Sequence, residues 1–411
     1  MKIRPTGLAQ FITAFGLLLM TGNVLADSSA MKTKAQELAH NSMIADTHID
    51  VPYRLEESWD DVSVGTEGGD FDYPRAKKGG LDLPFMSIYT PASMETTDGD
   101  ASESFQLANR LIDSVEALAG RAPDKFMMVY SVEDAKKAMR NDRIGLALGL
   151  ENGSPINNDL KNVQYFADRG IRYITLAHSL SNHISDSSYD DNRRWGGLSP
   201  FGKDVVAEMN RVGVMIDISH VTDDAFFQVM ELSKVPVIAS HSSPRHFTPG
   251  WERNMSDEMI KALAKNGGVI QINFGSGFLR QQAREWNDTM DAKRTEYLEA
   301  NGHDEHGSES QQFEKDYRVK NPYPYATMDD LMASFEHVIN LVGPEYVGIG
   351  SDFDGVGDSL PEGMKDVSYF PMLIEELLKK EYSVEVIRGI LGGNLMRVWS
   401  EVEAYSENAS S

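Results

Sequence analysis

The chain has 411 residues, a formal net charge of −24 at pH 7 and no cysteine. Without cysteine there can be no disulfide and no thiolate metal site, and the acidic balance argues against nucleic acid or an anionic membrane as a partner. The length suits one (β/α)8 barrel with insertions.

Residues 1–26 have the pattern of a cleavable export signal. Lys2 and Arg4 precede an apolar stretch over residues 11–20, and small residues then lead into a polar sequence. The apolar stretch is shorter than the ~20 residues that a spanning helix needs, so we expect cleavage and export to the periplasm or outside the cell. No later run is long enough to span, and the C-terminus lacks a lipid-anchor tail. Residues 27–411 are therefore expected to form a single soluble barrel domain without a membrane anchor.

The rest of the chain alternates between apolar runs and helix candidates. Several helix candidates have their own start signal, such as Ser131 before residues 132–140 and Thr222 before residues 223–233. Eight apolar runs are found, at residues 43–50, 81–90, 144–151, 171–178, 213–220, 235–241, 269–274 and 346–352. This alternation predicts parallel strands joined by crossover helices. Eight strands favour a closed (β/α)8 TIM barrel over an open doubly wound sheet, which would need a glycine-rich phosphate turn that the sequence lacks.

Two segments fall outside this alternation. Residues 56–80, rich in Asp and Gly, are expected to form a long first βα loop, and residues 280–325 are a charged insertion after the seventh strand. Loops at the carboxyl end of barrel strands commonly build or cover the active site. The insertion also suits a contact in a homodimer or a solvated excursion, and the sequence does not decide between these.

Several of the apolar runs end in carboxylate or imidazole side chains. His48 and Asp50 are two residues apart, so on an extended strand they point to the same face. Glu151 ends a wholly apolar run, where a carboxylate has a raised pKa unless a cation compensates its charge. His220 and His241 each end a run on a Ser-His step. A lone histidine there is more often a hydrogen-bonded core residue, but three at one rim together with carboxylates favour metal ligands, because isolated charges are costly to bury.

This set of nitrogen and oxygen donors suits Zn²⁺ in an open hydrolytic site, although ligand type leaves Mn²⁺ or Co²⁺ open. Two such ions would activate water at neutral pH and polarise a carbonyl group. Asp352 lies in a glycine-rich motif, where the backbone can approach closely, and is a candidate to carry a proton between that water and a leaving amine. The neighbouring Asp354 is expected to have a structural role.

The order and spacing of these motifs resemble the membrane (renal) dipeptidase family of binuclear zinc peptidases. The resemblance covers most of the chain after residue 26 and rests on DTHID, GLENG, ITLAHS, DISH, ASHSSPR, RNMSDE, GSDFDG and GGNLMRV. It implies that His48 and Asp50 bind one zinc ion and that His220 and His241 bind the other. Glu151 is then similar to the carboxylate that bridges the two ions.

The resemblance also implies roles for three more residues. Asp352 is similar to the family's general acid/base, and His178 to the histidine that contacts the substrate carbonyl region and stabilises the tetrahedral oxyanion. Arg253 is similar to the arginine that holds the terminal carboxylate of the dipeptide, a role that suits its planar fork. The chain departs from the family in having no cysteine for the disulfides of mammalian members, no lipid-anchor tail, and the insertion at residues 280–325, which leaves the shape of the substrate pocket open.

These observations predict an exported zinc dipeptidase that accepts dipeptides, including those with a D-residue at the C-terminal position; whether it also opens β-lactam rings stays open. An N-acyl amino acid deacylase or lactonase on the same centre is an alternative, because fold and ligands do not separate these activities. A periplasmic peptide-binding protein without catalysis is another, although the complete ligand set and Asp352 argue against it. The remaining histidines are expected in helices, in loops or behind the site: His40, His183, His246, His303, His306 and His337.

Overall fold

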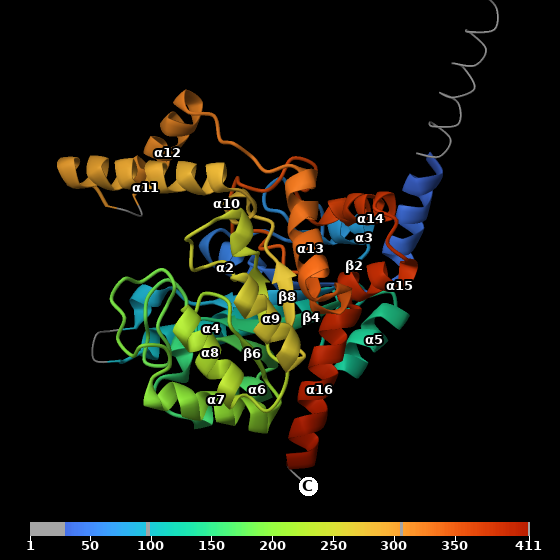
Figure 1. Ribbon diagram of the computed structural model, residues 1–411, viewed down its shortest axis with the longest axis horizontal. Coiled ribbons are helices and arrows are strands. Elements are labelled where there is room, and N and C mark those ends of the chain that lie inside the picture. The colour runs from blue at the N-terminus through green and yellow to red at the C-terminus, as the bar shows by residue number, and fades with distance from the viewer. Residues whose placement is uncertain (1–28, 96–98, 305–306, 410–411) are drawn as a thin grey trace, which may run out of the picture.

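The computed structural model describes residues 29–95, 99–304 and 307–409; the expected signal at residues 1–26 lies outside them. Eight parallel strands close into a barrel with helices around it (Figure 1), which confirms the predicted (β/α)8 fold. In the order β1-β2-β4-β5-β6-β7-β8-β9 each strand pairs with the next, and β9 pairs with β1. The strands are β1 (Ile44–Ile49), β2 (Leu81–Tyr89), β3 (Phe126–Met128), β4 (Ile144–Glu151), β5 (Ile171–Thr175), β6 (Met215–Asp217), β7 (Ile238–Ser242), β8 (Val269–Ile272) and β9 (Val347–Ile349).

The strand β3 was not predicted. It pairs with the first three residues of β4, whereas β2 pairs with β4 from Ala147 onward, so β3 lies outside the ring of eight. Three residues are too few to show an alternating pattern in the sequence.

The predicted helix starts at Ser131 and Thr222 are confirmed by their caps, and other helices begin in the same way. The side chains of Ser131, Ser199, Thr222, Ser256 and Thr327 each accept a hydrogen bond from the backbone N–H three residues on, which typically stabilises a helix by about 1 kcal/mol. The helices span residues 29–41 and α2 (Val51–Glu57), α3 (Tyr73–Gly79), α4 (Ser102–Arg121), α5 (Val132–Arg140), α6 (Lys161–Asp168), α7 (Pro200–Val212), α8 (Asp223–Leu232), α9 (Asp257–Asn266), α10 (Ser276–Leu279), α11 (Gln281–Asn301), α12 (Ser308–Lys320), α13 (Met328–Val342), α14 (Phe370–Lys379), α15 (Val384–Arg388) and α16 (Asn394–Ala409). Among the described residues, no helix combines the length and apolarity that crossing a bilayer would require.

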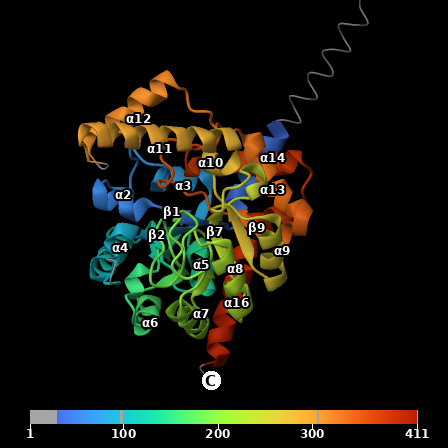
Figure 2. The ribbon, with the colours of Figure 1, turned by 60° about the vertical axis from the view of Figure 1, so that its left-hand side comes forward.

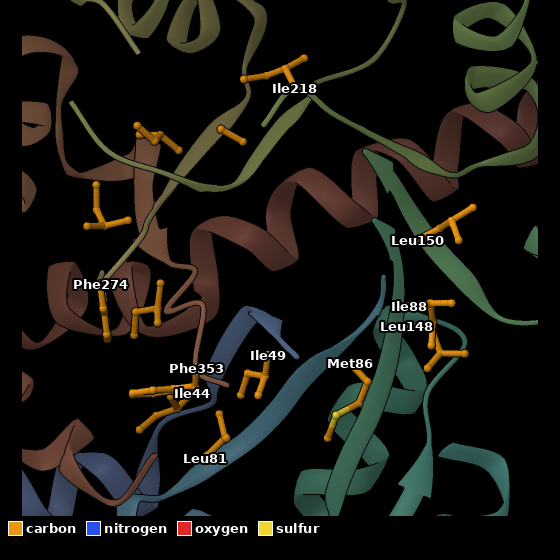
Figure 3. Packing of buried hydrophobic residues seen from close by; sticks show 14 of the residues in the cluster. Ile44, Ile49, Leu81, Met86, Ile88, Leu148, Leu150, Ile218, Phe274 and Phe353 are labelled. Atoms are coloured by element: carbon orange, nitrogen blue, oxygen red, sulfur yellow. The ribbon is translucent and has the colours of Figure 1, made fainter. Parts of the chain in front are cut away.

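The strand β4 shows how the sequence divides the two faces of the barrel wall. Its residues Ile144, Leu146, Leu148 and Leu150 pack in the main hydrophobic cluster, which also contains Leu81 and Met86 of β2 (Figure 3). Ala147 belongs instead to a second cluster with Phe85, Tyr173 and Trp399. Because side chains alternate along a strand, Glu151 lies on the same face as Gly145, Ala147 and Gly149.

Small residues on this inner face of β4 leave space for aromatic rings. A Cβ atom at Gly149 would lie 2.0 Å from the ring of Tyr173. That ring stacks on Phe85 at 5.7 Å, and Phe85 contacts Trp399 of α16 at 5.4 Å. Three stacked or edge-packed aromatic rings therefore fill the barrel interior, and the ring of Tyr173 is the one nearest the carboxyl ends of the strands.

The two irregular segments contain more regular structure than expected. Residues 56–80 do not form one long loop, because α2 begins directly after β1 and α3 occupies residues 73–79. The insertion at residues 280–325 is built mainly from α11 and α12, which project beyond the barrel in both views (Figures 1 and 2). Trp286 of α11 packs against Tyr317 of α12 at 5.2 Å, so the two helices support each other.

Candidate metal centre

The structure brings the predicted ligands together at the carboxyl ends of the barrel strands. His48 lies in β1 and His241 in β7, while Glu151 is the last residue of β4 and Asp50 directly follows β1. His220 lies three residues past the end of β6, so the prediction that it ends a strand is wrong. Its backbone has a φ of 69°, an uncommon conformation for a residue other than glycine.

The two carboxylate oxygens of Glu151 face different partners. Oε2 lies 3.3 Å from His48 Nε2, and that nitrogen also lies 3.3 Å from Asp50 Oδ2. Oε1 lies 3.3 Å from the Nε2 atoms of both His220 and His241. One carboxylate thus joins two groups of donor atoms, which is the arrangement that a bridging ligand requires.

The contacts among these side chains fit bound cations better than hydrogen bonds alone. The Nε2 atoms of His220 and His241 are 2.8 Å apart, and both approach the same oxygen of Glu151. Neutral imidazoles carry one N–H each, so three acceptor atoms that converge in this way are best satisfied by one shared cation. The imidazole and carboxylate donors are those that zinc takes in hydrolytic sites. The residues present therefore fit a binuclear zinc centre.

The carboxylate of Glu151 stays negatively charged and favours positive charge at the groups that surround it. Burial alone would raise the pKa of Glu151, but His48 and His178 hold it well below its ordinary value. Burial would likewise lower the pKa of His48, yet Tyr173, Glu151 and Asp50 raise it well above its usual range. A field that stabilises an imidazolium at this position would also stabilise a metal cation.

The imidazoles of His220 and His241 are held neutral. Burial lowers the pKa of both well below the ordinary value, and the nearby positive charge of Arg253 adds to this effect. Neutral imidazole is the form that binds metal ions. Both histidines are therefore ready to act as ligands at neutral pH.

Two of the histidines are oriented by residues behind them. His48 Nδ1 lies 2.9 Å from the hydroxyl of Tyr173. His241 Nδ1 lies 2.7 Å from Ser240 Oγ, which donates to Asp217 Oδ2 at 2.6 Å. When each imidazole is neutral and donates its Nδ1–H to this partner, the Nε2 lone pair faces the centre, as in many metal sites.

These orienting residues were missed in the sequence. Asp217 and Ser240 lie inside the motifs that end at His220 and His241, so the motifs themselves carried a signal for them. Tyr173 stands in an apolar run where nothing marks it as polar in function.

Asp352 lies beside the centre. One of its carboxylate oxygens lies within 4.8 Å of ligand atoms of His48 and Asp50, and Asn273 Nδ2 donates to its Oδ2 at 2.7 Å. Burial raises the pKa of Asp352 to about 7, an effect that bound cations would oppose. Its backbone φ of 64° places it, like His220, in the left-handed region, where strain is often found at functional sites.

Asp354 has the structural role that was predicted for it. Its Oδ2 accepts from Arg54 Nε at 3.0 Å, and its Oδ1 accepts from the backbone N–H of Asp70 at 2.6 Å. These bonds tie the loop after β9 to α2 and to the segment that follows it.

His178 and Arg253 complete the set of predicted residues. His178, three residues beyond β5, has its Nε2 3.5 Å from Glu151 Oε1. Arg253 donates to Ser242 Oγ at 2.7 Å and to the carbonyl of His241 at 2.8 Å. Its Nη2 also lies 3.1 Å from His220 Nε2, and a cation bound to that nitrogen would use the same lone pair. Contact with Arg253 and metal binding are therefore alternatives for His220.

A cavity of about 590 Å³ opens onto this centre, a size typical of small-molecule sites. Residues from distant parts of the chain line it, among them Tyr53, His178, Tyr189, Trp251, Arg253 and Arg284. The other histidines have different partners: His40 contacts Gln36, His183 contacts Glu95, His246 stacks on His337, His303 packs near Tyr297, and His306 lies outside the described residues.

Comparison with known proteins identifies the family. The model of the membrane dipeptidase family (peptidase family M19) matches residues 32–411. The chain belongs to this family. As a family member it is a dipeptidase, a hydrolase of peptide bonds, which confirms the resemblance found in the sequence motifs.

Individual family relatives agree in sequence and in fold. Dipeptidase 3 of Mus musculus is 28% identical over 388 residues, covering 92% of this chain and 68% of the mouse protein. An uncharacterized dipeptidase of Schizosaccharomyces pombe is 29% identical over 399 residues, covering 93% of this chain and 86% of that protein. The crystal structure of the probable dipeptidase PvdM from Pseudomonas aeruginosa superposes with a TM-score of 0.78 at 27% identity, covering 92% of this chain and 99% of PvdM.

The hydroxyl of Tyr173 gives a prediction about metal affinity. Changing Tyr173 to Phe removes the partner of His48 Nδ1 and should weaken zinc binding about 10- to 100-fold, as is typical when such a partner is lost. Competition with a chromophoric chelator measures this affinity. The control is Tyr405→Phe, at an exposed site on α16, which should leave the affinity unchanged; equal affinities in both variants would show that Tyr173 does not orient His48.

Proposed function

We propose that this dipeptidase is exported and uses two zinc ions, held by His48, Asp50, Glu151, His220 and His241. The observation that carries the proposal is the division of the Glu151 carboxylate, with Oε2 toward His48 and Oε1 toward His220 and His241. His48 and Asp50 would hold one ion, His220 and His241 the other, and Glu151 would bridge them. When bound, such a pair supplies a water-derived nucleophile at neutral pH and polarises the carbonyl that is attacked.

Asp352 is suited to move the proton. Its carboxyl group lies near His48 and Asp50, and Asn273 fixes one of its oxygens while the other stays available. It would accept a proton from the attacking water and return it to the leaving amine. The raised pKa that burial causes supports this role, because proton transfer is most effective when the pKa of the group is close to the working pH.

His178 and Arg253 would bind the substrate. His178 lines the cavity and is more exposed than the buried His48 and His241, so it can donate to the oxygen that becomes negative in the transition state. Arg253 also lines the cavity, and its planar guanidinium suits a terminal carboxylate. Metal binding at His220 would free one N–H of the Arg253 Nη2 for that contact, while its bond to the carbonyl of His241 remains. Recognition through the carboxylate restricts the enzyme to substrates with a free C-terminal carboxylate next to the bond that is cleaved.

We further propose that a D-residue is accepted at the C-terminal position. The family resemblance motivates this, and the volume of the cavity supports it, because a side chain can be placed on either side of a substrate held by its carboxylate.

The main test of the function uses protein stripped of metal and then reloaded with zinc. We expect two zinc ions per chain by elemental analysis and hydrolysis of L-Ala-L-Ala and L-Ala-D-Ala, with no turnover of N-acetylalanine or a simple lactone. Turnover of N-acetylalanine without hydrolysis of any dipeptide would reverse the assignment in favour of a deacylase. Tight dipeptide binding without any turnover would indicate a binding protein.

The role of Asp352 is tested by changing it to Asn. The amide cannot carry the proton, so kcat should fall by about 10²- to 10⁴-fold, while the zinc content stays near two per chain. Asp358→Asn is the matched control, because Asp358 is an exposed carboxylate on the same loop, and this variant should keep wild-type activity. Full activity of Asp352→Asn would remove Asp352 from the mechanism, and loss of zinc would make it a ligand instead.

Export is tested by following the N-terminus. Cells of a Gram-negative host that express the full chain should release a soluble protein that begins at Asp27 from the periplasm, as shown by intact mass. Recovery of the uncleaved chain in the cytoplasm or the membrane fraction would contradict the proposal.

A further inference from the structure

A second guanidinium group lines the substrate cavity beside Arg253. Arg284, on the first turn of α11, belongs to the insertion at residues 280–325. Asn287, one turn further along α11, lines the same cavity. The insertion therefore contributes directly to the pocket wall rather than only extending away from the barrel.

Aromatic rings connect the two arginines along one wall. The guanidinium of Arg253 lies 5.1 Å from the ring centre of Phe278, and Phe278 packs against Trp251 at 4.9 Å. The guanidinium of Arg284 lies 4.4 Å from the ring centre of Trp251. All four side chains line the cavity. This wall thus carries two cations. Arg253 lies next to the metal centre, and Arg284 lies further along the wall, separated from Arg253 by the rings of Phe278 and Trp251.

Arg284 differs from the other arginines of the cavity in that its ion partner is exposed to solvent. Arg54 is paired with Asp354, and Arg253 is buried and bonded to Ser242 and His241. Arg284 is 21% exposed, and its ion partner Asp288, four residues on along α11, is 53% exposed. An ion pair at this spacing with one exposed partner is weak, so a carboxylate in the cavity can replace Asp288.

The stacking on Trp251 also prepares Arg284 for binding. A guanidinium held against an aromatic face keeps its planar fork in one orientation, and less freedom is lost when it binds a carboxylate. Forked pairing of this kind is strong and geometrically selective.

We propose that Arg284 binds a second anionic group of the substrate, the side-chain carboxylate of an acidic residue at the C-terminal position. The inference rests on the proposed function, in which Arg253 holds the terminal carboxylate and so places the C-terminal residue against this wall. An acidic side chain at the N-terminal position would not benefit, because Arg284 lies beside the C-terminal residue and the carboxylate of Glu57, which also lines the cavity, would repel a second carboxylate. The substrate class is therefore dipeptides that end in Glu or Asp.

The experiment compares isosteric pairs of substrates. The zinc-loaded wild type, Arg284→Met, Arg284→Lys and Lys293→Met are assayed with L-Ala-L-Glu and L-Ala-L-Gln, and with L-Glu-L-Ala and L-Gln-L-Ala. Lys293 is an exposed cation on the same helix that does not line the cavity, so its substitution removes the same charge without removing the site. The unfolding midpoint of each variant is measured to show that it is folded.

We expect the wild type to prefer Ala-Glu over Ala-Gln in kcat/KM, and Arg284→Met to lower that ratio about tenfold or more. Arg284→Lys should lower it by less, Lys293→Met should leave it unchanged, and the ratio for Glu-Ala over Gln-Ala should not respond to residue 284. Equal losses on Ala-Glu and Ala-Gln would show that Arg284 only supports the wall, and an unchanged ratio would overturn the inference while the proposed function stands. Failure of the wild type to hydrolyse any of the four dipeptides would overturn both.

Discussion

The structure depends on one buried negative charge, the carboxylate of Glu151. It stands at the end of a strand whose other residues are all apolar and buried, where an isolated carboxylate would be strongly destabilising. Four imidazoles surround it within 3.5 Å, from β1, β7 and the segments after β5 and β6. The charge of Glu151 is compensated only when all of these elements are folded around it. The fold of the barrel and the assembly of the centre therefore depend on each other.

The position of the ligands around Glu151 also depends on the packing inside the barrel. Gly149 has no side chain, so the ring of Tyr173 can lie against β4, and the hydroxyl of Tyr173 then reaches His48. The same ring packs on Phe85, which packs on Trp399. A ligand at the carboxyl end of the barrel is therefore oriented by packing that extends to the last helix. Close-packed interiors transmit such positional demands because they have little free volume.

Much of the fold, and which residues gather at the centre, could be predicted from the sequence for a physical reason. Buried parallel strands must be apolar, so a carboxylate at the end of such a run is conspicuous, and Glu151 was found in this way. His48 was found by its spacing from Asp50 on an extended strand. The signal is weaker where structure depends on distant packing. The strand β3 is too short for a pattern, and the place of Tyr173 depends on a glycine in another strand. The backbone of His220 and Asp352 leaves the extended conformation for the left-handed region, so extrapolating an alternating strand through them misplaced the strand ends.

The barrel positions the metal ligands, whereas the insertion at residues 280–325 contributes part of the wall of the substrate cavity. Strand ends are held on both sides by their neighbours, which gives the precision that metal ligands and a proton carrier need. A helix such as α11, which projects from the barrel (Figure 2), is less constrained and can vary without disturbing Glu151. Arg284 and Asn287, on its first two turns, still line the cavity, because α10 follows β8 after a short link and α11 follows α10. Changes in this segment can therefore alter which side chains the enzyme accepts while the centre that breaks the peptide bond stays the same.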